Sequence, residues 1–175
     1  MIKQGILENR VNRVYLSIGS NLGNKLKNLE NVKYYLNISG ISILKTSSYY
    51  NSKSWPNENF PNFLNIVLLV STKLNLIKLF LKIKSIEKSM GRIVTKKNYP
   101  RICDIDIIDF NGKCYSEKYL NNLINIPHQR MHKRNFVLLP LYEINKTWFH
   151  PKLKKNIVNL IAKLSSNDLR SIKFI

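Results

Sequence analysis

Arg101-Ile102-Cys103-Asp104-Ile105-Asp106-Ile107-Ile108 is the segment from which the rest of the chain is best understood. Its apolar, β-branched residues predict a buried strand that carries carboxylates at positions i and i+2. Side chains alternate across a strand, so Asp104 and Asp106 point to one face. Cys103 points to the other face, where we expect a small buried residue.

Two neighbouring carboxylates on an apolar strand repel each other and lose hydration. A divalent cation removes both penalties, and hard oxygen ligands suit Mg²⁺, which keeps some of its water and accepts phosphate oxygens. The competing interpretation is a solvated pair at the end of a strand. Arg101 beside the strand, followed by His128, Arg130 and Arg134, favours metal-assisted chemistry on a polyphosphate.

The chain has 175 residues, of which 44% are hydrophobic, enough for a packed core. We expect residues 1–12 to be an N-terminal extension and residues 13–175 to form a single domain. No apolar run approaches the ~18 residues of a transmembrane helix. The first dozen residues lack the apolar region of a signal peptide. The sequence therefore predicts a cytoplasmic protein that does not bind membranes, and we expect it to be a monomer.

The formal charge is +19, from 29 lysines and arginines against 10 acidic residues. A basic surface can bind nucleic acid. However, lysine, asparagine and isoleucine are abundant throughout, as in proteins encoded by A/T-rich genes, so the charge says little about partners. Arginine is informative because its planar, forked donors match phosphate oxygens. Four arginines fall in one quarter of the sequence: Arg92, Arg101, Arg130 and Arg134.

Strand and helix patterns alternate along the chain. A strand at 14–18 precedes a helix at 25–36, which Asn24 caps and which buries Leu26, Leu29, Val32 and Leu36. Strands follow at 41–50 and 63–72, then a helix at 74–90 that Gly91 ends. After the acidic strand come an Asn111-Gly112 turn, a strand at 124–126, and helices at 135–144 and 154–164. The order β-α-β-β-α-β with a C-terminal helical addition predicts a ferredoxin-like α+β fold.

Three loops are candidates for ligand contacts. The turn Gly19-Ser20-Asn21-Leu22-Gly23-Asn24 can cradle phosphate, although a plain turn is the favoured interpretation. The segment 51–62 carries two aromatic residues that we expect to be exposed, Trp55 and Phe60, and a loop of this length is often functional. The segment 92–100 carries Lys96 and Lys97, and it either folds over phosphates or is simply solvated.

Together these motifs resemble the hydroxymethyl-dihydropterin pyrophosphokinase family, over about residues 14–144. The similar segments are Gly19 to Gly23, Phe63-Leu64-Asn65, Gly91-Arg92, Pro100 to Ile107, Ile126-Pro127-His128, and Arg134-Asn135-Phe136-Val137-Leu138. Members of the family transfer the β,γ-diphosphate of ATP to the hydroxymethyl oxygen of 6-hydroxymethyl-7,8-dihydropterin and release AMP, in folate biosynthesis. The resemblance implies this activity, a ferredoxin-like fold, and two Mg²⁺ ions with ATP as co-substrate.

The resemblance also implies roles for individual residues. Asp104 and Asp106 would hold both Mg²⁺ ions and, with Arg92 and Arg101, make up the catalytic set. The positions expected to contact ATP are Arg92, Arg101, Ile107, His128 and Arg134, with Ile107 beside the adenine, where backbone groups would make the contacts. Glu87 matches a frequent acidic position in the family, without an assigned role.

For the pterin, the resemblance implies that Phe63 and Phe136 stack on the two faces of the ring. Asn65 would read the edge of the pterin, because an amide offers both a donor and an acceptor. Trp55, on the loop 51–62, is the fourth expected contact. The alternative interpretation is that the two phenylalanines are ordinary core residues and that Asn65 is a buried hydrogen-bonding amide.

Two other classes of protein fit part of the pattern. A nucleic-acid-binding module would suit the fold and the charge, but Asp104 and Asp106 would repel phosphate unless a metal intervened. A metal-dependent phosphohydrolase could use the same carboxylates, but it needs a residue that positions water, and the sequence offers no good candidate. We therefore expect the partners to be small molecules, ATP and the reduced pterin, rather than nucleic acid.

Overall fold

The structure is a computed structural model that describes residues 11–54, 57–92, 99–120 and 122–175. Its mixed α+β fold is built on a central antiparallel sheet. In the described part of the chain six strands form this sheet, in the order β10-β3-β4-β1-β5, with β2 also paired to β4. The strands are β1 (Asn12–Ser20), β2 (Ile41–Thr46), β3 (Tyr50–Ser52), β4 (Phe63–Thr72), β5 (Asp104–Phe110) and β10 (Lys173–Phe174).

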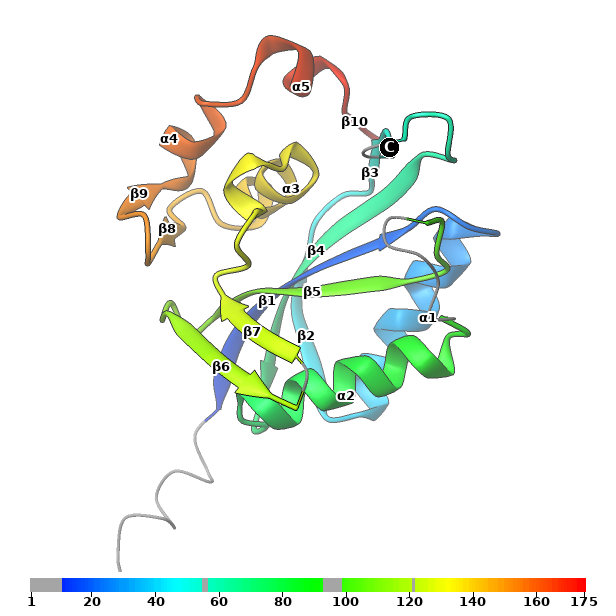
Figure 1. Ribbon diagram of the computed structural model, residues 1–175, viewed down its shortest axis with the longest axis vertical. Coiled ribbons are helices and arrows are strands. Elements are labelled where there is room, and N and C mark those ends of the chain that lie inside the picture. Colours follow the sequence, from blue (N-terminus) through cyan, green and yellow to red (C-terminus); the bar gives the residue numbers. More distant parts are fainter. Residues whose placement is uncertain (1–10, 55–56, 93–98, 121) are drawn as a thin grey trace, which may run out of the picture.

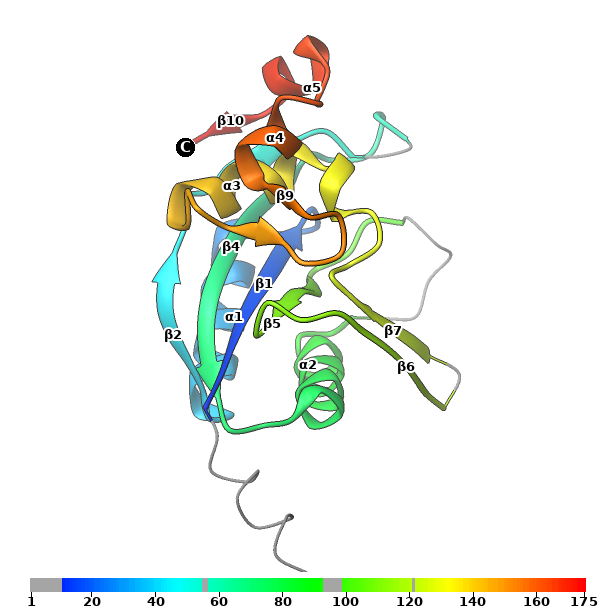
Figure 2. The ribbon, with the colours of Figure 1, turned by 90° about the vertical axis from the view of Figure 1, so that its left-hand side faces the viewer.

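Helices cover both faces of the sheet, so its central strands are buried on two sides (Figure 1, Figure 2). Leu29 of α1 and Leu79 of α2 share a core with Ile66 of β4 on one face. On the other face Val67 of β4 shares a second core with Leu138 of α3. The helices on the sheet are α1 (Lys25–Ile38), α2 (Leu76–Ser89), α3 (Asn135–Ile144) and α4 (Ile157–Ile161).

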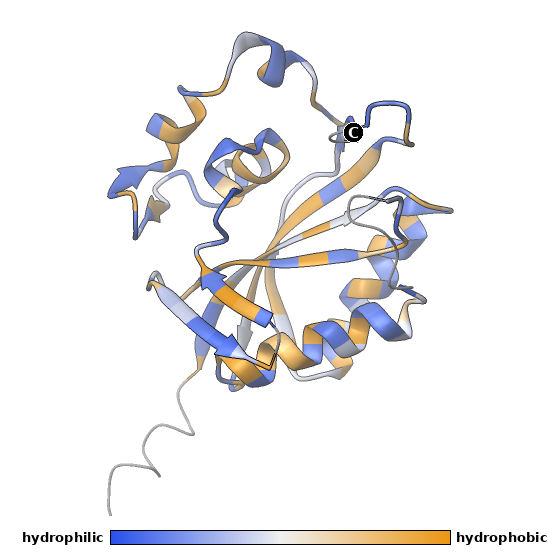
Figure 3. Cartoon of the chain, viewed as in Figure 1, coloured by the Kyte–Doolittle hydropathy of each residue, from blue (hydrophilic) through white to orange (hydrophobic). Residues whose placement is uncertain are grey.

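Strand β5 has the two faces that the sequence predicts, and Figure 3 shows it as alternating hydrophilic and hydrophobic bands. Ile105 and Ile107 are buried in the core beneath α1 and α2. Asp104 and Asp106 point to the opposite face, each about one third exposed. Cys103 is fully buried in the α1 and α2 core, as predicted, and burial raises the pKa of its thiol to about 12.

The predicted ends of both long helices are confirmed. The side chain of Asn24 accepts a hydrogen bond from Lys27 N at 3.0 Å and caps α1. Gly91, which follows α2, has φ +84°, a left-handed conformation that glycine adopts at little cost. The prediction that Leu26 lies on the buried face of α1 is wrong, because its side chain is 51% exposed.

The predicted strand at 41–50 is divided in two. Ser47 Oγ accepts a hydrogen bond from Val67 N at 2.9 Å, and Ser48 N donates to the Glu143 carboxylate at 2.9 Å. These side-chain bonds interrupt the pairing with β4 between the end of β2 and the start of β3. They depend on residues far away in the sequence, which the local pattern does not reveal.

The C-terminal part is also less regular than predicted. Lys154 has φ +53°, and the two residues after it pair with a short strand, so the helix predicted at 154–164 is wrong in its bounds. Asn156 caps the helix that does form by accepting from Asn159 N at 2.8 Å. The remaining elements are β6 (Tyr115–Tyr119), β7 (Asn122–Ile126), η1 (Met131–Lys133), β8 (Phe149–His150), β9 (Lys155–Asn156) and α5 (Ser166–Arg170).

The strand predicted at 124–126 is the inner part of β7, which pairs with β6 in a separate two-stranded sheet. The Asn111-Gly112 turn has positive φ at both residues, as a tight hairpin turn requires. None of the helices in the described residues is long and apolar enough to cross a membrane.

Candidate active site

A cavity of about 1070 Å³ opens on the face of the sheet that carries Asp104 and Asp106. Small residues of β1 lie opposite the two carboxylates in the strand register: Gly19 is paired with Asp104, and Ser17 with Asp106. Because neither residue is large, the carboxylates face open space rather than a side chain of the neighbouring strand. The floor of the cavity is therefore acidic and lightly covered.

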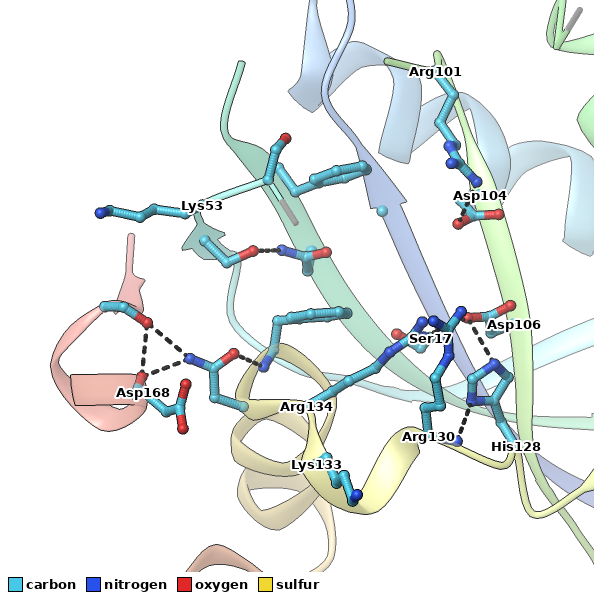
Figure 4. Close-up of a pocket in the computed structure, with 18 of the residues that line it drawn as sticks. Ser17, Lys53, Arg101, Asp104, Asp106, His128, Arg130, Lys133, Arg134 and Asp168 are labelled. Carbon is cyan, nitrogen blue, oxygen red and sulfur yellow. Dashed lines mark hydrogen bonds and ion pairs between the residues drawn. The ribbon is translucent and has the colours of Figure 1, made fainter. Parts of the chain in front are cut away.

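Arginines from two sides hold Asp104. Arg92 donates to its Oδ1 at 2.8 Å, and Arg101 donates to its Oδ2 at 3.1 Å. Both guanidinium groups are partly exposed to the cavity. Figure 4 shows Arg101 reaching Asp104 from just before the start of β5. The predicted phosphate-binding arginines thus meet the predicted metal-binding carboxylate.

A second group of cations surrounds Asp106. Arg134 donates to its Oδ2 at 3.1 Å, and His128 Nε2 lies 3.9 Å from the same oxygen. Arg130 extends into the cavity beside them (Figure 4). Burial, followed by the nearby arginines Arg134 and Arg130, lowers the pKa of His128 against the opposing effect of Asp106. His128 is therefore neutral near pH 7.

The hydrogen bonds of His128 identify its tautomer. Arg130 N donates to Nδ1 at 3.2 Å, so this nitrogen must be the unprotonated one. The proton of the neutral ring then lies on Nε2, on the side of Asp106. His128 can therefore donate one hydrogen bond to an anion in the cavity.

Glu87 of α2, which the sequence left without a role, supports this end of the site. Its carboxylate is 2% exposed; Oε1 accepts from Ile105 N at 2.9 Å and also pairs with Arg92. Its Oε2 pairs with Lys84 at 2.8 Å. Glu87 thus links the first residues of β5 to the guanidinium of Arg92, and it fixes both relative to α2.

The opposite end of the cavity is aromatic, with Phe63, Asn65 and Phe136 in its lining. Asn65 donates from Nδ2 to Ser52 Oγ at 2.9 Å and to Tyr50 O at 3.2 Å. Because the carbonyl of Tyr50 can only accept, these bonds fix the orientation of the amide and direct its oxygen away from β3. Three of the four residues predicted to contact the pterin therefore lie in one cavity with Asp104 and Asp106.

Gly19 keeps this end open. A Cβ atom at position 19 would lie 2.9 Å from Asn65 Oδ1 and 3.3 Å from the ring of Phe63. The sequence places Gly19 in a turn, but it belongs to β1; within that segment it is Gly23 that has a positive φ, +66°. The residues of the segment beyond Gly19 do not line the cavity, which agrees with the favoured interpretation as a plain turn.

Asn21, another residue of that segment, joins the loops around the cavity. Its Oδ1 accepts from Arg101 N at 2.8 Å, and its Nδ2 donates to Ser54 Oγ at 3.1 Å. Phe60 contacts the ring of Tyr99 with 5.5 Å between centroids, so Phe60 is half-buried rather than exposed as predicted. Trp55, Lys96 and Lys97 lie outside the described residues.

Of the other predicted site residues, Ile107 stands apart. Its side chain is buried in the core under α1 and α2, on the far side of β5 from the carboxylates. Several lining residues were not predicted, because only tertiary packing brings them to the cavity. They include Ser17, Ser52, Lys53, Lys84, Lys133, Asn167, Asp168 and Ser171.

Comparison with known proteins identifies relatives of this chain. Residues 15–146 match the family model described as 7,8-dihydro-6-hydroxymethylpterin-pyrophosphokinase (HPPK). The chain is 40% identical over 146 residues to the 2-amino-4-hydroxy-6-hydroxymethyldihydropteridine pyrophosphokinase of Aquifex aeolicus, covering 81% of this chain and 86% of the relative. It is 35% identical to the folic acid synthesis protein fol1 of Pneumocystis carinii, covering 91% of this chain but only 21% of that protein.

A solved structure has a similar fold. Wild-type Plasmodium falciparum HPPK-DHPS, determined with pterin and p-hydroxybenzoate, superimposes with a TM-score of 0.75 at 18% identity, over 96% of this chain and 46% of that one. At this identity the likeness concerns the fold alone. The family match covers most of the sequence, and the Aquifex relative is matched over most of its own length. The chain therefore belongs to the 7,8-dihydro-6-hydroxymethylpterin-pyrophosphokinase family.

Proposed function

We propose that this chain transfers the β,γ-diphosphate of ATP to the hydroxymethyl oxygen of 6-hydroxymethyl-7,8-dihydropterin and releases AMP. The observation that carries the proposal is the polarity of one cavity. Its charged end combines two carboxylates with the three arginines that pair with them, and its other end combines Phe63, Phe136 and Asn65. A polyphosphate suits the first end and a flat, hydrogen-bonding ring suits the second.

The donor set at the charged end fits Mg²⁺. Asp104 and Asp106 offer hard oxygen ligands on one face of β5, and no group of three or more acidic, histidine or cysteine ligands occurs among the described residues. Mg²⁺ commonly takes one or two carboxylates and completes its shell with water and substrate phosphates. We propose that the pair holds two ions, which when bound neutralise phosphate charge and acidify the hydroxymethyl group.

The arginines act on the triphosphate in this proposal. Arg92, Arg101 and Arg134 are already directed into the cavity by their pairs with Asp104 and Asp106. A bound triphosphate would offer them stronger acceptors without a large movement of the side chains. Donors held in place beforehand stabilise charge that shifts toward the leaving AMP, and they do so without the cost of reorganising. His128 adds a neutral donor beside them.

The other end of the cavity positions the attacking alcohol. Both amide hydrogens of Asn65 are used by Ser52 and Tyr50, so its oxygen is the atom that remains to accept from the pterin edge. We therefore propose that Asn65 offers the pterin an acceptor only, rather than both the donor and the acceptor expected from the sequence. Phe63 and Phe136 would stack on the ring. Holding the alcohol close to the β-phosphorus is a large part of the catalysis that we propose.

Further assignments belong to the same proposal. The order β5-β1-β4-β2 with helices α1 and α2 on one face supports a ferredoxin-like core. We propose that residues 13–175 form one domain that is active as a monomer, because a single chain supplies groups at both ends of the cavity. We propose small molecules rather than nucleic acid as the ligands, because the cavity combines the charged end with an aromatic end, and we propose a cytoplasmic protein.

Product analysis tests the proposal. The chain is incubated with ATP, Mg²⁺ and 6-hydroxymethyl-7,8-dihydropterin, and the nucleotides and pterins are separated. We expect AMP and a diphosphorylated pterin in equal amounts, and no AMP when the pterin is left out. ADP with a monophosphorylated pterin would contradict the diphosphate transfer. Free phosphate released without the pterin would favour a phosphohydrolase instead.

A further inference from the structure

Residues 165–175, which we call the C-terminal strap, lie outside the segment that matches the family model. The strap comprises α5, a short connection and β10. It runs from α4 past the N-terminal end of α3 to the edge of the sheet (Figure 1). Three of its residues, Asn167, Asp168 and Ser171, line the cavity at the end opposite the metal carboxylates. Figure 4 shows Asp168 far from Asp104 and on the side of the cavity where α3 begins.

The first attachment of the strap is Asn135, the first residue of α3. Its side-chain nitrogen donates to Asp168 O at 2.6 Å and to Ser171 Oγ at 3.0 Å, while its oxygen accepts from Phe136 N at 2.7 Å. Asn135 is 9% exposed, so these bonds are shielded from water. Arg134 at the N-cap makes no side-chain capping bond. The start of α3, which carries Phe136, is therefore held by the same side chain that holds the strap.

The second attachment is to β3, on the other side of the aromatic end of the cavity. Strand β10 pairs with β3, and Ile175 N donates to Tyr49 O at 2.8 Å. The ring of Phe174 contacts that of Tyr50 with 6.4 Å between centroids. Strand β3 also supplies both acceptors that orient Asn65, the carbonyl of Tyr50 and the hydroxyl of Ser52. The strap thus connects the wall that carries Phe136 to the wall that orients Asn65.

We propose that the C-terminal strap is a positioning element for the pterin, and that Asn135 is the positioning residue that attaches it to Phe136. The inference rests on the proposed function, because it assumes that Phe136 and Asn65 contact the pterin. Stacking on a flat ring is sensitive to spacing, since a gap of ~0.5–1 Å forfeits a quarter to a half of the dispersion attraction. A strap that fixes the two walls therefore controls pterin affinity, while Arg92 and Arg101, the phosphate contacts that hold Asp104, are not attached to it.

Asn135→Asp tests the first attachment. The carboxylate is similar in size and still accepts from Phe136 N, but it cannot donate, and it faces the carbonyl of Asp168. We expect the Kd of the reduced pterin to rise about tenfold, a change on the scale of a single aromatic contact. The Kd of a non-hydrolysable ATP analogue, measured by calorimetry with the same protein, is expected to rise by no more than about twofold, because Arg92 and Arg101 lie at the other end of the cavity and Arg134 keeps its own pair with Asp106.

The second attachment has a matched pair of variants. Ile175→Pro removes the N–H that donates to Tyr49, whereas Ile175→Ala keeps this N–H and shortens only a side chain that is 74% exposed. We expect Ile175→Pro to weaken pterin binding about threefold, the scale of one lost exposed hydrogen bond, and Ile175→Ala to leave it unchanged. Pterin binding that falls equally in both variants would overturn the role of the pairing.

The outcomes separate the two proposals. If the unsubstituted protein does not bind the pterin, the proposed function is contradicted and the strap has no pterin to position. If it binds the pterin and Asn135→Asp binds it equally well, the strap proposal alone is overturned. Equal losses for pterin and ATP analogue in Asn135→Asp, with a lower melting temperature, would show that Asn135 only stabilises the fold, and would also overturn it.

Discussion

Asp104 and Asp106 illustrate how single residues set the chemistry of this chain. Each carboxylate points into the cavity because it alternates with a buried isoleucine, and each is held by arginine. This much follows from the sequence, since strand alternation is a local property. The sequence did not reveal that Gly19 and Ser17 face the pair, because that depends on the register between β1 and β5.

The first prediction concerns these carboxylates. Asp104→Asn and Asp106→Asn keep the shape and the ability to accept a hydrogen bond, but remove the charge that holds Mg²⁺. We expect each to reduce kcat well beyond tenfold, while circular dichroism and the melting temperature show a folded protein. Activity above about a tenth of the original, a barrier increase below ~1.4 kcal/mol, would exclude either residue as an essential metal ligand.

The second prediction concerns Gly19. In Gly19→Ala the new methyl group would meet Asn65 Oδ1 at 2.9 Å, so the amide and the ring of Phe63 must shift. We expect weaker pterin binding by about tenfold, the scale of a core that is overpacked by one methyl group, with little change for an ATP analogue. Calorimetry with both ligands makes the comparison. Equal weakening of the two would mean that the methyl group disturbs the whole cavity, and would contradict a role of Gly19 at the pterin end.

At the scale of elements, the sequence predicted β4 at its observed bounds and α1 and α2 within two residues, because each has a strong apolar pattern between clear end signals. It failed where distant residues decide the conformation. Glu143 and Val67 interrupt the strand predicted at 41–50. The strap was missed for the same reason, since its short elements owe their positions to Asn135 and to β3.

The third prediction concerns Arg92 and Arg101, the arginines on either side of the stretch that carries Lys96 and Lys97. Arg92 is fixed by buried Glu87, and Arg101 is anchored through its backbone by Asn21. We propose that Arg92 acts mainly on the transition state. Arg92→Ala should lower kcat about a hundredfold, the scale of one lost electrostatic donor, with only a modest change in ATP Kd. Arg101→Ala should impair both quantities.

Single-turnover rates and nucleotide Kd values for the two variants distinguish these roles. The control is Lys53→Ala, which removes a cation at the aromatic end of the cavity, where Lys53 pairs with Glu58 rather than with Asp104 or Asp106. Tenfold weaker ATP binding in Arg92→Ala, with an unchanged chemical step, would mean that Arg92 is a binding residue only.

At the scale of the whole molecule, the sheet separates two cores and leaves the cavity on the side of α3. The second core extends to the hairpin of β8 and β9 through Trp148. The Nε1 of Trp148 donates to buried Asp109 at 3.1 Å. Burial raises the pKa of Asp109. Stability on this side of the sheet therefore depends on polar groups that are buried far from the cavity.

The fourth prediction is a pH dependence that arises there. His150 is 3% exposed, and its Nδ1 accepts from Lys152 N at 3.3 Å and from Leu153 N at 3.2 Å. Burial, and then His132, lowers the pKa of His150 from 6.5 to about 4. The unfolded chain therefore takes up the proton more readily. The contribution of His150 to stability is complete above about pH 6.5 and decreases as the pH falls toward 4.

His150→Asn tests this pH dependence, because its amide oxygen can accept in place of Nδ1 but does not titrate. We expect the difference in melting temperature between pH 7.5 and pH 4.5 to be smaller in His150→Asn than in the unsubstituted protein. His132→Asn is the matched control on the neighbouring, more exposed ring. The same loss of stability on acidification in His150→Asn and the unsubstituted protein would assign the acid sensitivity to other groups.

The central claim is that one cavity holds a triphosphate at its carboxylate end and a pterin at its aromatic end. A crystal structure with a non-hydrolysable ATP analogue, 6-hydroxymethyl-7,8-dihydropterin and Mn²⁺ in place of Mg²⁺ tests it directly, since manganese is located by its anomalous signal. We predict manganese between Asp104 and Asp106, phosphates beside Arg92, Arg101 and Arg134, and the pterin between Phe63 and Phe136. Phosphates bound away from the two carboxylates, or a pterin outside the two rings, would contradict the account.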